Sequence, residues 1–107
     1  MAKLNDSALA KNGSTNSFRT TRLGSFGTIF YGDLDGETLT LELSKDGATW
    51  RTFYAAGVAQ TYTNSSDVAN GVIYELPGGY WWRWTMSNGA GTPSGVFVEV
   101  DGENVAV

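Results

Sequence analysis

Residues 36–50, Gly-Glu-Thr-Leu-Thr-Leu-Glu-Leu-Ser-Lys-Asp-Gly-Ala-Thr-Trp, decide the fold class of this 107-residue chain. Between Glu37 and Ser44 a leucine stands at every second position, and this period of two places one side of a β-strand in a core. The Asp46-Gly47 pair readily adopts the positive φ angles of a tight hairpin. We therefore predict a strand over 37–44 and a returning strand over 49–55, with Trp50 in the core beside the turn.

Short β-rich runs separated by Gly, Asn and Asp recur from Phe18 onward at spacings of about 8 to 12 residues, which is typical of an all-β sandwich or barrel. In the aromatic run over 80–86, alternation predicts that Trp82 and Trp84 are buried. The other predicted strands cover 28–34, 60–63, 71–76, 94–101 and 104–107. We predict an antiparallel β-sandwich, Ig-like or jelly-roll-like, of about seven or eight strands.

A second Asp-Gly pair, Asp35-Gly36, directly precedes the leucine strand. We predict that it joins the strand over 28–34 to the leucine strand as a hairpin, which gives a meander of three strands. Asp33, Asp35 and Glu37 also resemble the start of a calcium loop, but Ser44 stands at the twelfth position, where such a loop needs a bidentate Glu. An ordinary turn is the favoured interpretation, and no metal site is predicted.

The chain contains no His and no Cys, which removes the usual zinc ligands, the Ser-His-Asp and Cys-His triads, and disulfides. No pair of its carboxylates is singled out for glycoside hydrolysis. We predict a protein that is not an enzyme and that binds no cofactor. The sequence shows no signal peptide and no apolar stretch near the roughly 20 residues of a membrane span, so we expect cytosolic synthesis and no membrane partner.

The formal net charge of −4 is unevenly distributed. Up to Ser25, four basic residues and Asp6 give +3, whereas three basic and ten acidic residues give −7 in the rest. Within residues 1–17, the stretch 5–17 is small and polar with one apolar trio, a composition that cannot build its own core. We interpret them as an extended N-terminal arm on a β-sandwich domain at 18–107, either frayed or ordered only against a partner. The acidic body would repel a phosphate backbone, so we expect no nucleic-acid partner.

Trp81 and Arg83 form an outward pair of the residue types enriched at protein interfaces. Whether a partner or another part of the fold covers Trp81 is left open by the sequence. The predicted partner-binding residues are Lys3, Lys11, Phe18, Arg19, Arg22, Trp81 and Arg83. As an alternative, Trp81 together with Tyr62 would offer aromatic surface to sugar rings, as in a carbohydrate-binding module.

The run from Gly36 to Trp50 resembles a pattern frequent in small virion proteins of tailed bacteriophages, in which an alternating strand leads into Ser-x-Asp-Gly-x-x-Trp. Residues 76–83, Leu-Pro-Gly-Gly-Tyr-Trp-Trp-Arg, resemble the turn and aromatic strand that follow in such β-sandwich modules. The resemblance covers roughly residues 26–101. The hairpin is also similar to the Asp-box of sialidase-like propellers, but it lacks one residue between Asp and Gly, and no repeat supports a propeller.

The resemblance implies a capsid decoration or cement protein on the virion surface, synthesised in the host cytoplasm. Such a protein would bind the major capsid protein as a homo-oligomer, with a trimer favoured, and bridge neighbouring subunits of the shell. The arm would then become ordered on the shell, where its cations meet acidic capsid surface. A neck or tail structural component, and a carbohydrate-binding module on a virion surface, are the alternatives.

Overall fold

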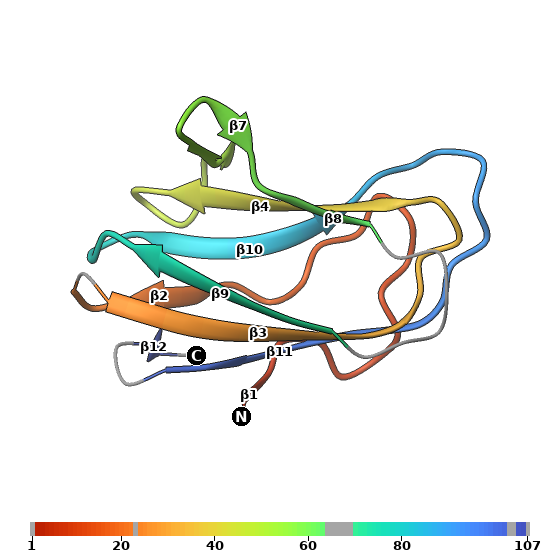
Figure 1. The fold of residues 1–107 in the computed structure, drawn as a ribbon, viewed down its shortest axis with the longest axis horizontal. Helices are drawn as coiled ribbons and strands as arrows, with labels where there is room; N and C mark the ends of the chain where they lie inside the picture. The colour runs from red at the N-terminus through yellow and green to blue at the C-terminus, as the bar shows by residue number, and fades with distance from the viewer. Residues whose placement is uncertain (1, 23, 64–69, 103–104, 107) are drawn as a thin grey trace.

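A computed structural model describes residues 2–22, 24–63, 70–102 and 105–106. In this part of the chain all regular secondary structure is β-strand, in two main antiparallel sheets and one small hairpin (Figure 1). The predicted all-β, sandwich-like fold class is confirmed. The strands are β1 (Ala2–Lys3), β2 (Phe18–Thr20), β3 (Gly24–Asp33), β4 (Thr38–Ser44), β5 (Arg51–Thr52), β6 (Tyr54–Ala55), β7 (Val58–Ala59), β8 (Thr61–Thr63), β9 (Asn70–Leu76), β10 (Trp81–Met86), β11 (Ser94–Asp101) and β12 (Val105–Ala106).

The first sheet has the order β1-β11-β3-β9, and the second has the order β12-β2-β10-β4-β5, with β8 also pairing with β4. Most strands that follow one another in the sequence lie in different sheets, so the chain passes back and forth between the layers. Between β10 and β4, Trp82 lies opposite Leu43 and Trp84 lies opposite Leu41. This register places the tryptophans and leucines on one side of the second sheet, which is the side that faces the first sheet.

Aromatic side chains from both sheets fill the space between them. Trp82 and Trp84 are fully buried, as the alternation of the aromatic run predicts. The ring of Phe30 in β3 meets the Trp84 ring edge-on, with 4.9 Å between centroids. Phe18 of β2 and Phe26 of β3 form a second such pair at 5.2 Å. Edge-to-face pairs stabilise beyond the area that they bury, and these two pairs link one sheet to the other.

The Asp35-Gly36 turn does not form the predicted hairpin. Both residues have positive φ, 48° and 87°, and the Glu37 N–H donates to the Leu34 carbonyl at 2.9 Å, so the turn itself is tight. However, β3 belongs to the first sheet and β4 to the second, so the turn carries the chain across the sandwich. The predicted three-stranded meander is therefore wrong. The turn chemistry set the local geometry, but it did not determine whether the flanking strands pair.

The predicted returning strand over 49–55 is divided into two pieces. β5 covers two residues, and after Phe53 the chain leaves the sheet as the small hairpin β6–β7, which projects from the sandwich in Figure 1. Ala56 and Gly57 at its tip have positive φ, 52° and 79°, which closes a two-residue turn. The chain then returns to the edge of β4 through Gln60 and β8.

Residues 2–17 belong to the sandwich and do not extend from it as an arm. β1 pairs with β11, and the Leu4 N–H donates to the Val98 carbonyl at 2.8 Å. Leu4 is fully buried, and Leu9 also lies in the core. The Asn5 side chain accepts the Val98 N–H at 3.0 Å. Because these contacts are made within one chain, neither a frayed terminus nor a segment ordered only by a partner describes residues 2–17.

Replacing Leu4 by Ala tests this correction. Because a fully buried leucine leaves a cavity when it is truncated, we expect the free energy of unfolding to fall by about 2–5 kcal/mol. Urea unfolding followed by tryptophan fluorescence measures the change. Ser7→Ala, at an exposed position of the same segment, is the control and should shift it by less than about 0.5 kcal/mol. Equal stabilities of Leu4→Ala and the wild type would contradict the packing.

Thr28 provides a second test of the core. Its side chain is fully buried, and its hydroxyl has no hydrogen-bond partner among the described residues. Valine has nearly the same shape without the polar group, so we expect Thr28→Val to raise the free energy of unfolding by about 1 kcal/mol. Thermal unfolding measures this, with Thr40→Val, half-buried on β4, as the control for the change of residue type. A loss of stability in Thr28→Val would show that the hydroxyl is satisfied.

Candidate functional site

The outer side of β10 carries Trp81, Arg83 and Thr85, which alternate with its buried residues. The guanidinium of Arg19 lies over the Trp81 ring, 5.5 Å from its centroid, because β2 pairs with β10 and places the two residues opposite each other. The guanidinium of Arg83 lies over the Trp50 ring at 4.4 Å. We call Arg19, Trp50, Trp81 and Arg83 the Trp–Arg face.

The Trp–Arg face is held in place by contacts on several sides. Trp81 and Arg83 are half-buried, and the Trp81 ring also lies close to Gly47 in the turn between β4 and β5. A cation over an aromatic ring contributes about 0.5–1 kcal/mol at exposed sites. Side chains that are already fixed lose little conformational entropy when a partner binds, so this face is preorganised for binding.

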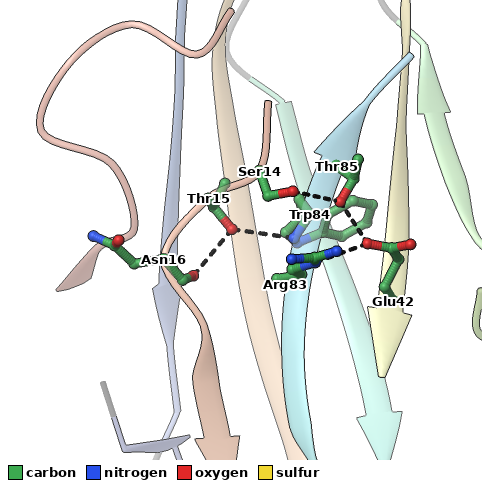
Figure 2. Close-up of polar contacts among 7 residues, drawn as sticks. All are labelled: Ser14, Thr15, Asn16, Glu42, Arg83, Trp84 and Thr85. Atoms are coloured by element: carbon green, nitrogen blue, oxygen red, sulfur yellow. Dashed lines mark hydrogen bonds and ion pairs between the residues drawn. The ribbon is translucent and has the colours of Figure 1, made fainter. Parts of the chain in front are cut away.

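Glu42 of β4 connects the Trp–Arg face to the N-terminal segment (Figure 2). Its Oε1 accepts hydrogen bonds from Arg83 Nε at 2.8 Å and from Thr85 Oγ1 at 2.5 Å. The hydroxyls of Thr85 and Ser14 lie 2.9 Å apart. A partly exposed ion pair contributes little to stability by itself. Its effect here is geometric, because Glu42 fixes the direction in which Arg83 points.

Thr15 continues this connection along β10. Its N–H donates to the Trp84 carbonyl at 2.9 Å, and its Oγ1 accepts the Trp84 N–H at 3.1 Å. The same hydroxyl donates to the Asn16 carbonyl at 3.0 Å (Figure 2). The N-terminal segment thus extends the pairing that β2 makes with β10, and it supports the strand that carries the face.

The structure brings Arg19, Trp81 and Arg83 together and separates the other predicted partner-binding residues from them. Lys3 lies on the first sheet, with its Nζ 5.4 Å from the centroid of an aromatic ring of β11. The Nζ of Lys11 donates to a backbone carbonyl in the loop after β10 at 3.0 Å. The two lysines therefore do not form one basic surface with the Trp–Arg face.

Phe18 and Arg22 also lie apart from this face. Phe18 is fully buried, so the predicted contact of its side chain with a partner is corrected. It alternates with exposed Arg19 in β2, a strand of only three residues at the start of the predicted sandwich domain, so the sequence offers little periodicity from which to read its burial. Arg22 is exposed, and its backbone lies so close to Gly78 that a Cβ at position 78 would collide with the Arg22 Cα.

Trp50 and Tyr62 each lie in another environment than the sequence predicted. Trp50, predicted in the core, is half-buried beneath Arg83, because β5 begins one residue later and strand alternation does not extend to Trp50. Tyr62 packs against the core and stacks on Phe30 with 4.1 Å between ring centroids. Trp81 and Tyr62 therefore lie on opposite sides of the second sheet and do not form the shared sugar-binding surface.

Glu37 is a buried carboxylate, with 2% of its surface exposed. It accepts hydrogen bonds from the Gly89 N–H at 2.6 Å, the Gly91 N–H at 2.7 Å and the Ser87 hydroxyl at 2.8 Å. These donors, with the Gly89 N–H as the largest cause, hold the pKa of Glu37 below its usual range. The loop after β10 is thus built around Glu37, which acts as a structural anchor.

The neighbouring carboxylates make similar local contacts. Asp33 accepts the Asp35 N–H at 2.8 Å, and Asp35 accepts the Thr92 N–H at 2.8 Å. Among the residues that the structure describes, no group of three or more His, Cys, Asp or Glu side chains is arranged to hold a metal ion. The carboxylates within residues 33–37 therefore stabilise the turns at which the chain passes from the first sheet to the second.

Asp46 organises the turn between β4 and β5. Its Oδ1 accepts the Ala48 N–H at 2.8 Å, the Thr49 N–H at 2.9 Å and the Ser44 hydroxyl at 2.9 Å. The Ser44 Oγ in turn accepts the Gly47 N–H at 2.9 Å. The Thr49 and Ala48 N–H groups and the Ser44 hydroxyl lower the pKa of Asp46 to about 2. The predicted hairpin is confirmed at this turn, since β4 and β5 pair directly.

Comparison of the chain with protein-family models, with curated proteins and with solved structures found no match. In the described part of the chain, no helix is long and apolar enough to cross a membrane. The candidate site is therefore defined by its own geometry, with the Trp–Arg face as the half-buried aromatic and cationic surface on one side of the sandwich.

The turn at Asp46 predicts a dependence of stability on pH. Because the folded-state pKa of about 2 lies below the ordinary value of 3.8, the carboxylate stabilises the fold above about pH 4, and this contribution is lost as the pH falls toward 2. Asp46→Asn removes the charge and should lower the melting temperature at pH 7, and much less at pH 2, where the folded-state carboxyl is already about half protonated. Thermal unfolding curves between pH 2 and pH 7 measure the difference in melting temperature from the wild type. Asp6→Asn, at an exposed position, is the control for the loss of one carboxylate. A difference that does not change with pH would contradict the role of the charge.

Proposed function

We propose that this chain is a non-enzymatic structural protein of a tailed-phage virion, which decorates the capsid by binding the major capsid protein through the Trp–Arg face. The observation that carries the proposal is the pair of half-buried tryptophans, each covered by a guanidinium, at the outer side of the second sheet. Trp and Arg are the residue types that dominate binding energy at protein interfaces. The resemblance of residues 36–50 and 76–83 to virion modules supplies the class of assembly.

This proposal differs from the sequence-based one in the part of the molecule that binds. We do not propose an arm that becomes ordered on the shell, because residues 2–17 pack against the sandwich through Leu4 and Thr15. Attachment through a rigid face costs little conformational entropy, and its geometry selects a complementary shell surface. Bridging between subunits then requires several copies of this domain, so a homo-oligomer on the shell, with a trimer favoured, belongs to the same proposal.

Binding to purified, undecorated capsids of the source phage tests this function. We expect saturable binding by the wild type, and Trp81→Ala should weaken it by about thirtyfold, the effect of losing one interface hot spot. Arg19→Ala, at an exposed position, should weaken binding as well while leaving the core intact. Sedimentation of capsids with bound protein, at increasing protein concentration, measures the affinity and the copy number.

Tyr54→Ala is the matched control, because Tyr54 is 60% exposed on the β6–β7 hairpin and does not belong to the Trp–Arg face. Unfolding curves of all variants confirm that they are folded under the conditions of the assay. Binding that is equally strong for Trp81→Ala and Tyr54→Ala would show that the face is not the attachment surface. Saturation at a few copies per particle would instead favour a neck or tail component.

A further inference from the structure

A pocket of about 310 Å³ lies beside the turn between β4 and β5. Its lining residues are Leu43, Ser44, Lys45, Asp46, Thr49, Arg51 and Tyr80. Leu43 and Tyr80 are partly buried against the core, and the Tyr80 ring meets the Trp82 ring at 6.4 Å between centroids. The apolar part of the pocket is therefore an extension of the core at the end of the second sheet.

The strand register places Arg51 on the same side of the sheet as this apolar surface. Arg51 lies directly opposite Leu43 in the β4–β5 pairing, and Leu43 lies opposite Trp82 in the β4–β10 pairing. Directly opposed residues of antiparallel strands have their side chains on one side of the sheet. The apolar wall of the pocket and the Trp–Arg face therefore lie on different sides of the second sheet, and the turn that begins at Ser44, opposite Trp81, lies at the edge between them.

Lys45 and Arg51 differ from the other cations in their contacts. The side chain of neither residue makes a hydrogen bond, ion pair or ring contact with any residue in the described ranges. The cations that do have such contacts are Lys3, Lys11, Arg19, Arg22 and Arg83. Lys45 and Arg51 thus both line one pocket, and none of the described residues occupies their side-chain hydrogen-bond donors.

Asp46 is the only carboxylate among the residues that line this pocket, and its Oδ1 already accepts three hydrogen bonds of the turn. With two cations and one carboxylate, the lining has a formal charge of +1, although the chain as a whole carries −4. The pocket is therefore a local positive region on an acidic protein, and it favours anionic over neutral or cationic ligands.

We propose that this pocket binds an acidic sugar residue, with its carboxylate at Lys45 and Arg51 and its ring over Leu43 and Tyr80. A guanidinium matches the two oxygens of a carboxylate, and a lysine adds a further charged donor. The C–H groups of a sugar ring lose water contact favourably against aliphatic and aromatic side chains. A pocket of about 310 Å³ is at the small end of ligand sites, which suits a single ring.

NMR titration of ¹⁵N-labelled protein with methyl glucuronide at low ionic strength tests the site. We expect saturable shifts in the amides of residues 43–51 and Tyr80, and binding that weakens as salt is added, because the two cations are exposed. Methyl glucoside, which lacks the carboxylate, should bind about tenfold more weakly. Acetate and inorganic phosphate report on the cations alone and should also bind more weakly than the glucuronide.

Two variants with the same change in net charge separate this site from a general charge effect. Lys45→Gln/Arg51→Gln should weaken glucuronide binding by about tenfold or more, whereas Lys3→Gln/Lys11→Gln should leave it unchanged. Equal binding of glucuronide and glucoside, equal binding of glucuronide and acetate, or no saturable shift at these amides would overturn the proposal. Each of these results would leave the proposed capsid attachment intact, because that function uses the other side of the sheet.

Discussion

The pleat of β10 is the constraint on which both the core and the candidate site depend. Because successive side chains of a strand point to opposite sides, the packing that buries Trp82 and Trp84 directs Trp81 and Arg83 outward. A buried hydrogen bond from Trp82 Nε1 to Thr20 Oγ1 at 2.9 Å fixes β10 against β2. A shift of one residue in register would exchange the two sets and place a guanidinium in the core. The packing that forms the core therefore also fixes the outward direction of Trp81 and Arg83.

Alternation in the sequence predicts which side of each strand faces inward, but it does not assign strands to sheets. Both layers use the same period of two and the same turn residues. Asp35-Gly36 and Asp46-Gly47 are equivalent as local signals, yet the first carries the chain across the sandwich and the second closes a hairpin. Part of the difference comes from Glu37, whose carboxylate anchors a loop that lies far away in the sequence. Contacts of that kind have no local pattern.

The sequence predicts the candidate site only where the site depends on alternation within one strand. Trp81 and Arg83 follow from alternation within one strand, whereas the position of Arg19 over Trp81 requires the β2–β10 pairing between distant segments. Trp50 precedes its strand, so no periodicity gives its direction. Leu4 and Leu9 are isolated buried leucines in a polar segment, where composition predicts an arm although the Leu4 backbone bonds to β11. Local composition fails there because the core that receives Leu4 is built by residues elsewhere in the chain.

The 44–49 turn contacts both surfaces of the second sheet and therefore links them. Gly47, with a φ of 77°, lies against the outward Trp81 ring, while Lys45 and Asp46 line the pocket at the sheet's end. The hydrogen bonds of Asp46 hold the turn as one unit. The conformation of this one turn therefore fixes both the surface against which the Trp81 ring lies and one wall of the pocket. The strands β4 and β10 in turn support the two surfaces, because they pair along the whole length of β10.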